Sequence, residues 1–536
     1  MSETKTITLF LNGADVRARE GRNLVDVCEE HGVDVPHFCY HPGLKVEGNC
    51  RMCMVEIEGM PKLQVACNMP AREGLKVHTN TEKVKEAQRA VLEFLLVNHP
   101  IDCPICDQAG ECYLQDYYML HGKYRSRLED EKVHKPKVVD LGPLVVLDTE
   151  RCVLCSRCVR FCRDVAGVEE LYIKNRGDHS EITTFPGRVL ENPYSGNVVD
   201  ICPVGALTSK DFRFKCRVWY LKSTPSVCPG CARGCNTHVD HHANEIQRLR
   251  PRENAAVNAW WLCDEGRLGY RSVHEGRLLG GWLRGKGETG AREAFEEIAG
   301  LLAVAAASEV GFVASPDLPL EAQFAVKRFA ALFAGARVAG GSLRPPWIED
   351  GLLRKADRHP NTKGLEILGL AGGLDAILER PPRLLVVFEE DLVGDGGERA
   401  RATLARVESL VVLGTRRTAT VEGARAALGV ATYAELDGTF VNFEGRLQRF
   451  RRALNPLGEA RALPEILADL AARLGKEIGW RPTPAGPEVL WRDLARETPA
   501  LEGVHFAEIP AEGLRLDLAR EAIASAGAPT EGRGGP

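Results

Sequence analysis

The sequence predicts a multidomain protein, with α+β modules in its first half and an α/β domain in its second half. Three observations support this class. All 18 cysteines fall in the first 263 of the 536 residues. The N-terminal segment alternates like strands joined by a tight turn. After residue 300, short buried-type strands alternate with helical stretches. The length also fits several folded units, since domains usually have about 100–200 residues.

Residues 1–80 are predicted to form the first domain. Thr6 to Leu11 alternates like a strand, Asn12-Gly13 is a strong hairpin turn, and Ala14 to Arg19 can pair back. A short helix capped by Asn23 follows. This order of strand, hairpin and helix, followed by a cysteine-rich loop, resembles the β-grasp fold of [2Fe–2S] ferredoxins.

Fifteen cysteines and one histidine fall into four groups with the spacing of iron–sulfur ligands. The groups are Cys39, Cys50, Cys53 and Cys67; His99, Cys103, Cys106 and Cys112; Cys152, Cys155, Cys158 and Cys202; and Cys228, Cys231, Cys235 and Cys263. Disulfides suit short secreted chains, and the start of this chain has no apolar signal-peptide core. Zinc usually takes two symmetric cysteine pairs, whereas triplets with one remote fourth ligand are typical of cubane clusters. Iron–sulfur chemistry is therefore favoured, with zinc as the stronger alternative.

The first group predicts one [2Fe–2S] cluster. Its loop from Gly48 to Cys53 is built of small and polar residues, which allow backbone N–H groups to face the sulfides. Cys28 lies on the apolar face of the preceding helix and is predicted to be a small buried side chain.

The second group lies in a predicted helical [4Fe–4S] domain, residues 81–140. Thr81 to Asn98 has helical spacing of its apolar residues and ends at His99-Pro100. A lone histidine at a helix end is more often a cap than a ligand. Three cysteines follow closely, however, and a cubane needs a fourth ligand. Because Cys67 and Cys152 are used by their own groups, the count favours His99 as that ligand.

The third group lies in a predicted ferredoxin-like [4Fe–4S] domain, residues 141–220. Bacterial two-cluster ferredoxins carry C-x2-C-x2-C-x3-C-P twice, and the fourth cysteine of each run serves the other cluster. The second run here keeps only Cys202-Pro203, and the three lost positions hold Asn192, Ser195 and Val198. Cys202 is therefore predicted to complete the third group. Cys162 would be the fourth ligand left over from the lost cluster site, and Cys216 is predicted to be a packed thiol.

The fourth group, in residues 221–277, resembles the [4Fe–4S] motif that opens molybdopterin oxidoreductases. Residues 278–525 then look like a reduced form of the α/β domain of those enzymes, with predicted parallel strands at Val310–Ala314, Leu384–Phe388 and Leu410–Gly414. Gly280 to Lys286 imitates a phosphate loop, but Gly287 stands where Ser or Thr would bind magnesium. No molybdopterin is expected. The Gly/Pro-rich tail, residues 526–536, is predicted to be disordered.

The order of the four groups closely resembles the large iron–sulfur (G-type) subunits of bacterial NADH–quinone oxidoreductase, respiratory complex I. The resemblance covers at least residues 1–277. A weaker resemblance, to part of the C-terminal region of the same subunits, is present at Gly438–Arg446. It implies one [2Fe–2S] and three [4Fe–4S] clusters that relay electrons from a flavin-bearing, NADH-oxidising partner toward quinone. It also implies other peripheral-arm partner subunits, and a peripheral place on the cytoplasmic side of the bacterial inner membrane.

Two other enzyme classes share these N-terminal motifs. An NAD-linked formate dehydrogenase α subunit adds a molybdenum catalytic domain, for which residues 278–536 look too short. An [FeFe]-hydrogenase needs further cysteines, and none follows Cys263. The net charge of −5 gives no argument for nucleic acid. No apolar run approaches the roughly 20 residues that span a bilayer.

Overall fold

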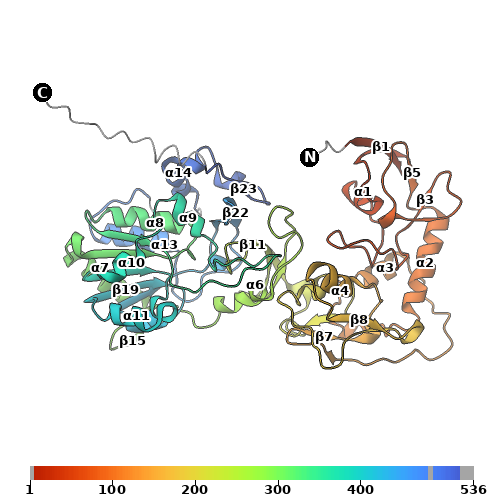
Figure 1. Cartoon of the computed structure of the whole chain (residues 1–536), viewed down its shortest axis with the longest axis horizontal. Coiled ribbons are helices and arrows are strands. Elements are labelled where there is room, and N and C mark those ends of the chain that lie inside the picture. Colours follow the sequence, from red (N-terminus) through yellow and green to blue (C-terminus); the bar gives the residue numbers. More distant parts are fainter. Residues whose placement is uncertain (1–4, 481–486, 519–536) are drawn as a thin grey trace. The chain divides into compact units, whose positions relative to one another are not determined.

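A computed structural model describes residues 5–480 and 487–518 (Figure 1). The chain divides into two compact units, Met1–Leu221 and Lys222–Pro536. The six-part division predicted from the sequence is finer than this and stays a prediction. The predicted disordered tail lies outside the described residues. Among the described residues, no helix has the length and apolar character needed to cross a membrane.

The first unit begins with a five-stranded sheet in the order β2-β1-β5-β3-β4. The predicted hairpin is confirmed, since β1 and β2 pair antiparallel around Asn12-Gly13. The Asn23 side chain caps α1 by accepting from the backbone N–H of Asp26 at 3.0 Å. Cys28 is 1% exposed in the core beneath the sheet, as predicted. The elements are β1 (Thr6–Leu11), β2 (Ala14–Arg19), α1 (Leu24–Glu30), β3 (Met54–Ile57), β4 (Gln64–Val65) and β5 (Lys76–His78).

Four helices and two small sheets complete the described part of the first unit. The predicted helix after Thr81 is confirmed as α2, and the Thr81 side chain caps it. Cys216 lies in a loop and is half-buried, and its assignment as a packed thiol stays a prediction. The elements are α2 (Glu82–Leu96), α3 (Tyr113–His121), β6 (Val139–Asp140), β7 (Val145–Leu147), α4 (Arg157–Arg160), β8 (Leu171–Lys174), β9 (Glu181–Thr184), α5 (Asn197–Asp200) and β10 (Leu207–Ser209).

The second unit is built on a seven-stranded sheet in the order β15-β14-β20-β19-β18-β16-β17. The strands β17, β16, β18, β19 and β20 are parallel, and an antiparallel β14–β15 hairpin closes one edge. Gly280–Lys286 falls in that hairpin, so it is not a phosphate loop. The strands are β14 (Gly281–Leu283), β15 (Gly287–Thr289), β16 (Val310–Ala314), β17 (Arg337–Gly340), β18 (Leu384–Phe388), β19 (Ser409–Gly414) and β20 (Ala426–Gly429).

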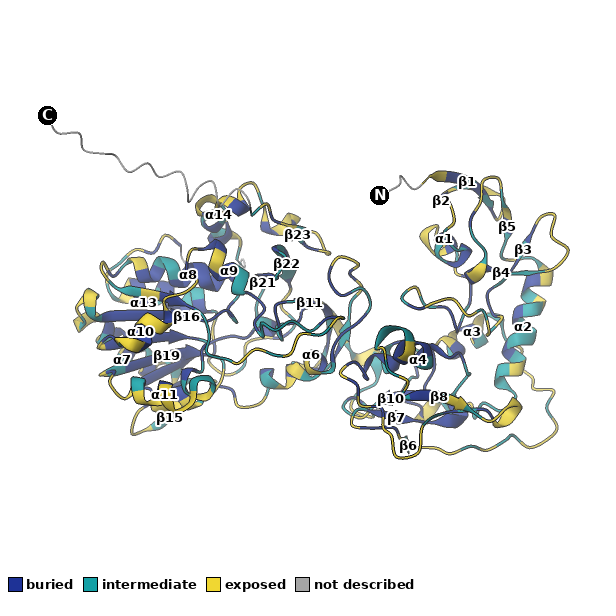
Figure 2. Cartoon of the chain, in the orientation of Figure 1, coloured by how far each residue is buried: buried dark blue, intermediate teal, exposed yellow. Residues whose placement is uncertain are grey.

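Successive side chains on a strand point to opposite faces, and both faces of this sheet carry apolar side chains. Helices cover both faces and bury them. Phe312 packs in the core with α7, α8, α13 and α14, whereas its neighbour Val313 packs in the opposite core with α10, α11 and α12. Figure 2 shows the central strands as buried. The helices are α7 (Ala291–Val304), α8 (Leu320–Ala331), α9 (Thr362–Ile367), α10 (Leu374–Glu379), α11 (Leu392–Leu404), α12 (Ala419–Gly423), α13 (Leu463–Arg473) and α14 (Glu488–Glu497).

Two three-stranded antiparallel sheets flank the large sheet in sequence. One carries the fourth cysteine group, and the other contains the segment Gly438–Arg446 as a hairpin. Asn442 shapes that turn, since its side chain accepts from the backbone N–H groups of Glu444 and Arg446. The elements are β11 (Lys222–Val227), β12 (Asn236–His242), β13 (Glu245–Pro251), α6 (Asp264–Leu268), β21 (Gly438–Val441), β22 (Arg446–Phe450) and β23 (Leu514–Arg515).

Candidate metal centres

The four thiols of the first group are joined by hydrogen bonds between Cys39 and Cys50, Cys39 and Cys67, and Cys53 and Cys67. The pKa of Cys39 is lowered to about 2 by hydrogen bonds from the Cys50 and Cys67 thiols and from the backbone N–H groups of Cys50 and Asn49. The Cys67 thiol likewise hydrogen-bonds to Cys53 and lowers its pKa. A loop that aims N–H groups at a thiolate fits a ferredoxin-type cluster, whose sulfurs accept such bonds. The donor set therefore fits a [2Fe–2S] cluster.

The four cysteines of the third group line one small cavity. Cys152, Cys155, Cys158 and Cys202 form its wall together with apolar side chains that include Leu147 and Leu207. Burial raises the pKa of Cys152 to about 12 and that of Cys155 to about 11. Iron binds the thiolate, so its positive charge would offset this cost of burying four sulfurs.

Cys162 does not line that cavity, although it belongs to the same segment. It is fully buried, and its pKa is raised to about 12 by burial and by the Glu170 carboxylate. The same carboxylate accepts from the Asn192 side-chain amide at 2.5 Å. Asn192, Ser195 and Val198, which stand at the lost cysteine positions, are all buried. A carboxylate disfavours a neighbouring thiolate, so this region is a poor place for a second cluster.

The second group brings three cysteines together beside the end of α2. Burial raises the pKa of Cys112 to about 11, and charges on Cys106 and Cys103 add to the effect. Burial lowers the pKa of His99 to about 4, so its imidazole is neutral as a metal ligand must be. His99 Nδ1 accepts from the backbone N–H of Ile101 at 3.1 Å. If His99 bound a metal through Nε2, its proton would move to Nδ1. Nδ1 could then no longer accept from the Ile101 N–H, and this hydrogen bond would be lost.

The role of His99 as the fourth ligand stays a prediction with a clear test. We expect His99→Cys to keep the cluster and to lower its reduction potential, because a thiolate adds one negative charge. His99→Ala should leave a labile site. Potentiometric EPR of the purified chain measures both effects, with His121→Cys as a matched control on the next helix. A structure with the His99 ring turned away from iron would end the hypothesis.

The fourth group is buried within the second unit. Cys228 and Cys231 follow β11, Cys235 precedes β12, and Cys263 precedes α6; all four are at most 6% exposed. The backbone N–H of Gly266 donates to Cys263 Sγ at 3.3 Å. A Cβ on Gly266 would lie 3.0 Å from Cys228 Sγ and 3.3 Å from Cys263 Sγ. Glycine therefore lets the backbone approach two candidate ligands at once.

Segments far away in the sequence hold the loop of the fourth group. The N–H of Phe443 donates to the Ala232 carbonyl at 2.9 Å, and the Gln448 amide donates to the Gly234 carbonyl at 2.8 Å. The N–H of Ala232 in turn donates to the Asp357 carbonyl at 2.9 Å. The segment Gly438–Arg446 and the strand after it thus support the cysteine loop.

Among the described residues, no three His, Cys, Asp or Glu donors are arranged to hold a single metal ion. A cluster contains several iron atoms bridged by sulfides, so its ligands need not meet at one point. Their assignment as ligands rests on burial, mutual proximity and N–H···S contacts, and it stays a prediction.

The third group contacts the ligand loops of the two other groups in the first unit. Arg160 on α4 donates to the carbonyl of Cys39, and Asn49 lies 3.5 Å from the Leu154 carbonyl. On the other side, a Cβ on Gly205 would lie 2.3 Å from Cys106 Sγ. The N–H of Tyr113, next to Cys112, donates to the Pro203 carbonyl at 3.0 Å.

Five family models match consecutive parts of the chain. They are the 2Fe-2S iron-sulfur cluster binding domain (residues 4–82), the NADH-ubiquinone oxidoreductase-G iron-sulfur binding region (88–127), the NADH-quinone oxidoreductase subunit 3 ferredoxin-like domain (142–208), the molybdopterin oxidoreductase Fe4S4 domain (221–275) and molybdopterin oxidoreductase (387–473). They confirm the predicted fold class.

Curated relatives agree with these models. The G-type subunit of NADH-quinone oxidoreductase from Rickettsia prowazekii is 42% identical over 324 residues, covering 60% of this chain and 48% of the relative. The mitochondrial NADH dehydrogenase [ubiquinone] iron-sulfur protein 1 of Solanum tuberosum is 47% identical over 281 residues, covering 52% and 38%. The chain is thus similar in sequence to the large iron–sulfur subunit of NADH–quinone oxidoreductase. The formate dehydrogenase alternative is not favoured.

The chain spans about half or less of the length of the curated relatives that it matches. A solved structure titled NAD+-reducing [NiFe]-hydrogenase in the H2-reduced state also matches, with 31% identity and a TM-score of 0.36. It covers 40% of this chain and 91% of that one.

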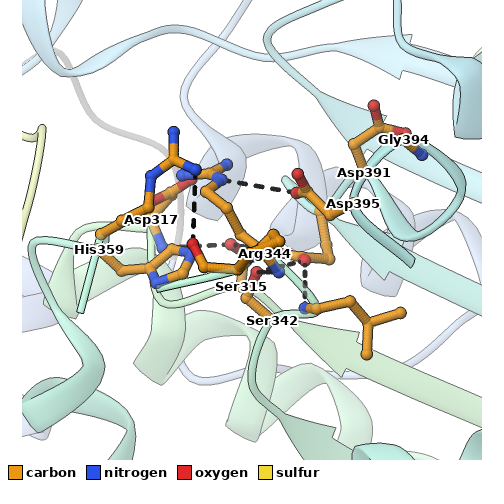
Figure 3. Close-up of polar contacts among 12 residues, drawn as sticks. Ser315, Asp317, Ser342, Arg344, His359, Asp391, Gly394 and Asp395 are labelled. Atoms are coloured by element: carbon orange, nitrogen blue, oxygen red, sulfur yellow. Dashed lines mark hydrogen bonds and ion pairs between the residues drawn. The ribbon is translucent and has the colours of Figure 1, made fainter. Parts of the chain in front are cut away.

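A cavity of about 970 Å³ opens beside the fourth group, and Cys228 forms part of its wall. Several arginines line this cavity, and one of them, Arg344, pairs with Asp317 at 2.9 Å and with Asp395 at 3.5 Å (Figure 3). Burial raises the pKa of Glu390 in the same wall to about 7. Glu390 accepts from the Ser315 and Ser342 hydroxyls at 3.0 and 2.6 Å.

Glu390 gives the second unit a specific pH dependence. Its raised folded-state pKa means that the unfolded chain loses the proton first, so stability falls as the pH rises to about 7. We expect Glu390→Gln to stabilise the unit by roughly 2–4 kcal/mol above that pH, and by less in acid. Denaturant unfolding at two pH values measures this, with the exposed Glu398→Gln as control. An equal gain at both pH values would refute the charge argument.

Proposed function

We propose that the chain is an electron-relay subunit of a complex I-type, proton-translocating NADH–quinone oxidoreductase. Electrons would enter from a flavin-bearing, NADH-oxidising partner and leave toward quinone-side subunits. The observation that carries this proposal is that three candidate cluster sites lie in one compact unit, with hydrogen bonds between the segments that carry their ligands. Clusters at these sites would supply one-electron carriers, while the NADH, flavin and quinone sites would lie on partners.

We assign one [2Fe–2S] cluster to the first group and one [4Fe–4S] cluster to each of the other three. The residues fit these clusters in burial and in donor type, as described above. The α/β domain of the second unit is proposed to bind no molybdopterin. Supporting this, the domain contains no cysteine that could ligate molybdenum, and Gly280–Lys286 falls in a β-hairpin rather than in a phosphate loop.

Partner subunits are proposed to dock where the second group lies. Large apolar side chains are exposed on the segments that carry or adjoin it, and such surfaces mark protein–protein contacts. These side chains are Phe94, Ile101, Ile105, Met119, Leu120 and Trp219. Trp219 lies against Gly110 in the cysteine loop, where a Cβ would be 3.1 Å from its ring. Membrane association, on the cytoplasmic face of the inner membrane, would come through these partners.

Iron analysis and EPR of the anaerobically purified chain test the proposal. We expect about 14 iron atoms per chain, from one two-iron and three four-iron clusters. Values near roughly ten or six would show that one or two groups are empty. Abundant zinc would refute the iron–sulfur assignment. NADH should reduce the clusters only when the flavin-bearing partner is present, and formate oxidation by the chain or bound molybdenum would favour the dehydrogenase.

A further inference from the structure

The short helix α4 buries two arginines among the candidate ligands of the third group. Arg157 and Arg160 are 4% and 3% exposed, and they flank Cys158 in the sequence. A guanidinium ion removed from water needs both hydrogen-bond acceptors and a counter-charge to be tolerated. The two arginines differ in how far the protein itself meets this requirement.

Arg160 has a conventional counter-charge. Its Nε lies 2.9 Å from a carboxylate oxygen of Glu47, and its other nitrogens donate to the carbonyls of Cys39 and Lys45. The ion pair reaches the surface, since the Glu47 side chain is 42% exposed. The charge on Arg160 is therefore largely compensated within the protein.

Arg157 has hydrogen-bond acceptors but no carboxylate. It donates to the Ile201 carbonyl at 3.1 Å and to the Tyr40 carbonyl, and its guanidinium lies 5.8 Å from the centre of the Tyr113 ring. Within residues 5–480 and 487–518, no Asp or Glu forms an ion pair with it. Its two carbonyl partners adjoin candidate ligands, because Ile201 precedes Cys202 and Tyr40 follows Cys39.

Arg157 lines the same small cavity as the four cysteines of the third group. Its guanidinium is therefore buried next to the place where a cluster bound by these sulfurs would lie. A buried cation surrounded by sulfur ligands and carbonyls, without a carboxylate, is suited to an anionic group bound at those sulfurs.

We propose that Arg157 is a positioning residue whose counter-charge is the third cluster, and that it raises the reduction potential of that cluster. This inference rests on the proposed iron–sulfur assignment of Cys152, Cys155, Cys158 and Cys202. Four thiolates give a cubane a net negative charge, and one added electron makes it more negative by one. A fixed cation stabilises the reduced form more than the oxidised form, so it favours uptake of the electron.

The test is a potentiometric EPR titration of the full-length chain with Arg157→Gln and Arg157→Lys. The EPR signal of the third cluster is first identified as the signal that Cys202→Ala removes. At the wild-type midpoint potential, we expect Arg157→Gln to lower the reduced-to-oxidised ratio of this signal roughly tenfold or more. For a one-electron couple, tenfold corresponds to about 59 mV. Arg157→Lys keeps the charge and should stay close to the wild-type ratio.

Arg163→Gln is the matched control, because Arg163 follows on the same segment but is exposed and paired with Asp164 at 2.9 Å. It should leave the ratio unchanged. An unchanged ratio in Arg157→Gln, with the signal present, overturns the charge role while leaving the relay proposal intact. Absence of the signal from the wild-type chain refutes the cluster assignment itself.

Failure of a variant to assemble the cluster is also informative. If Arg157→Gln loses the third cluster and Arg157→Lys keeps it at the wild-type potential, a positive charge is required at this position. If both variants lose it, the guanidinium acts only as a geometric clamp between Ile201 and Tyr40, and the charge proposal fails.

Discussion

Replacement of Cys202 by alanine is expected to abolish the third cluster, whereas replacement of Cys162 should leave it intact. Cys202 lines the same cavity as Cys152, Cys155 and Cys158, and Cys162 does not. The Glu170 carboxylate raises the pKa of Cys162 further after burial has raised it, which is the wrong environment for a ligand thiolate. In two-cluster ferredoxins the fourth cysteine of each run binds the other cluster, and this pattern also makes Cys202 the fourth ligand.

The two variants form a matched pair, since both remove a thiol from the third cluster domain. The Cys202 variant should lose about four iron atoms per chain together with one EPR signal. The Cys162 variant should keep both and lose only a little stability, about 1 kcal/mol. Loss of the signal in the Cys162 variant alone would reverse the assignment.

The features that the sequence predicted well are those set by local chemistry. The hairpin at Asn12-Gly13 and the cap at Asn23 depend on a few neighbouring residues, and the structure confirms both. The strands Val310–Ala314 and Leu384–Phe388 are continuous apolar runs, which parallel strands buried on both faces require. Cysteine spacing identified the modules because each cluster type demands its own spacing.

Contacts between distant segments were beyond the sequence argument. Nothing in the spacing indicated that Arg157 would bridge Tyr40 and Ile201, because side-chain contacts over such separations depend on how the domains pack. The count of ligands favoured His99, but its contact with the Ile101 N–H depends on a backbone turn that no motif encodes.

The cluster of the fourth group is expected mainly to stabilise the fold of the second unit. Its loop is fixed by Phe443, Gln448 and Asp357, residues that lie more than 100 positions away in the sequence. Removing a metal ligand would leave buried thiols without a counter-charge where these segments meet. Metal binding contributes directly to folding free energy because the binding site is assembled only in the folded chain. Loss of this cluster should therefore destabilise the whole second unit.

Replacement of Cys228, Cys231, Cys235 or Cys263 should therefore impair folding and assembly more than electron flow. We expect the free energy of unfolding of the second unit to fall by several kcal/mol, and the yield of assembled complex to fall with it. NADH–quinone reductase activity per assembled complex should change little. Cys202→Ala is the reciprocal control, because it should block electron flow while the second unit stays folded. A Cys228 variant that assembles normally but loses activity would place the fourth cluster on the electron path instead.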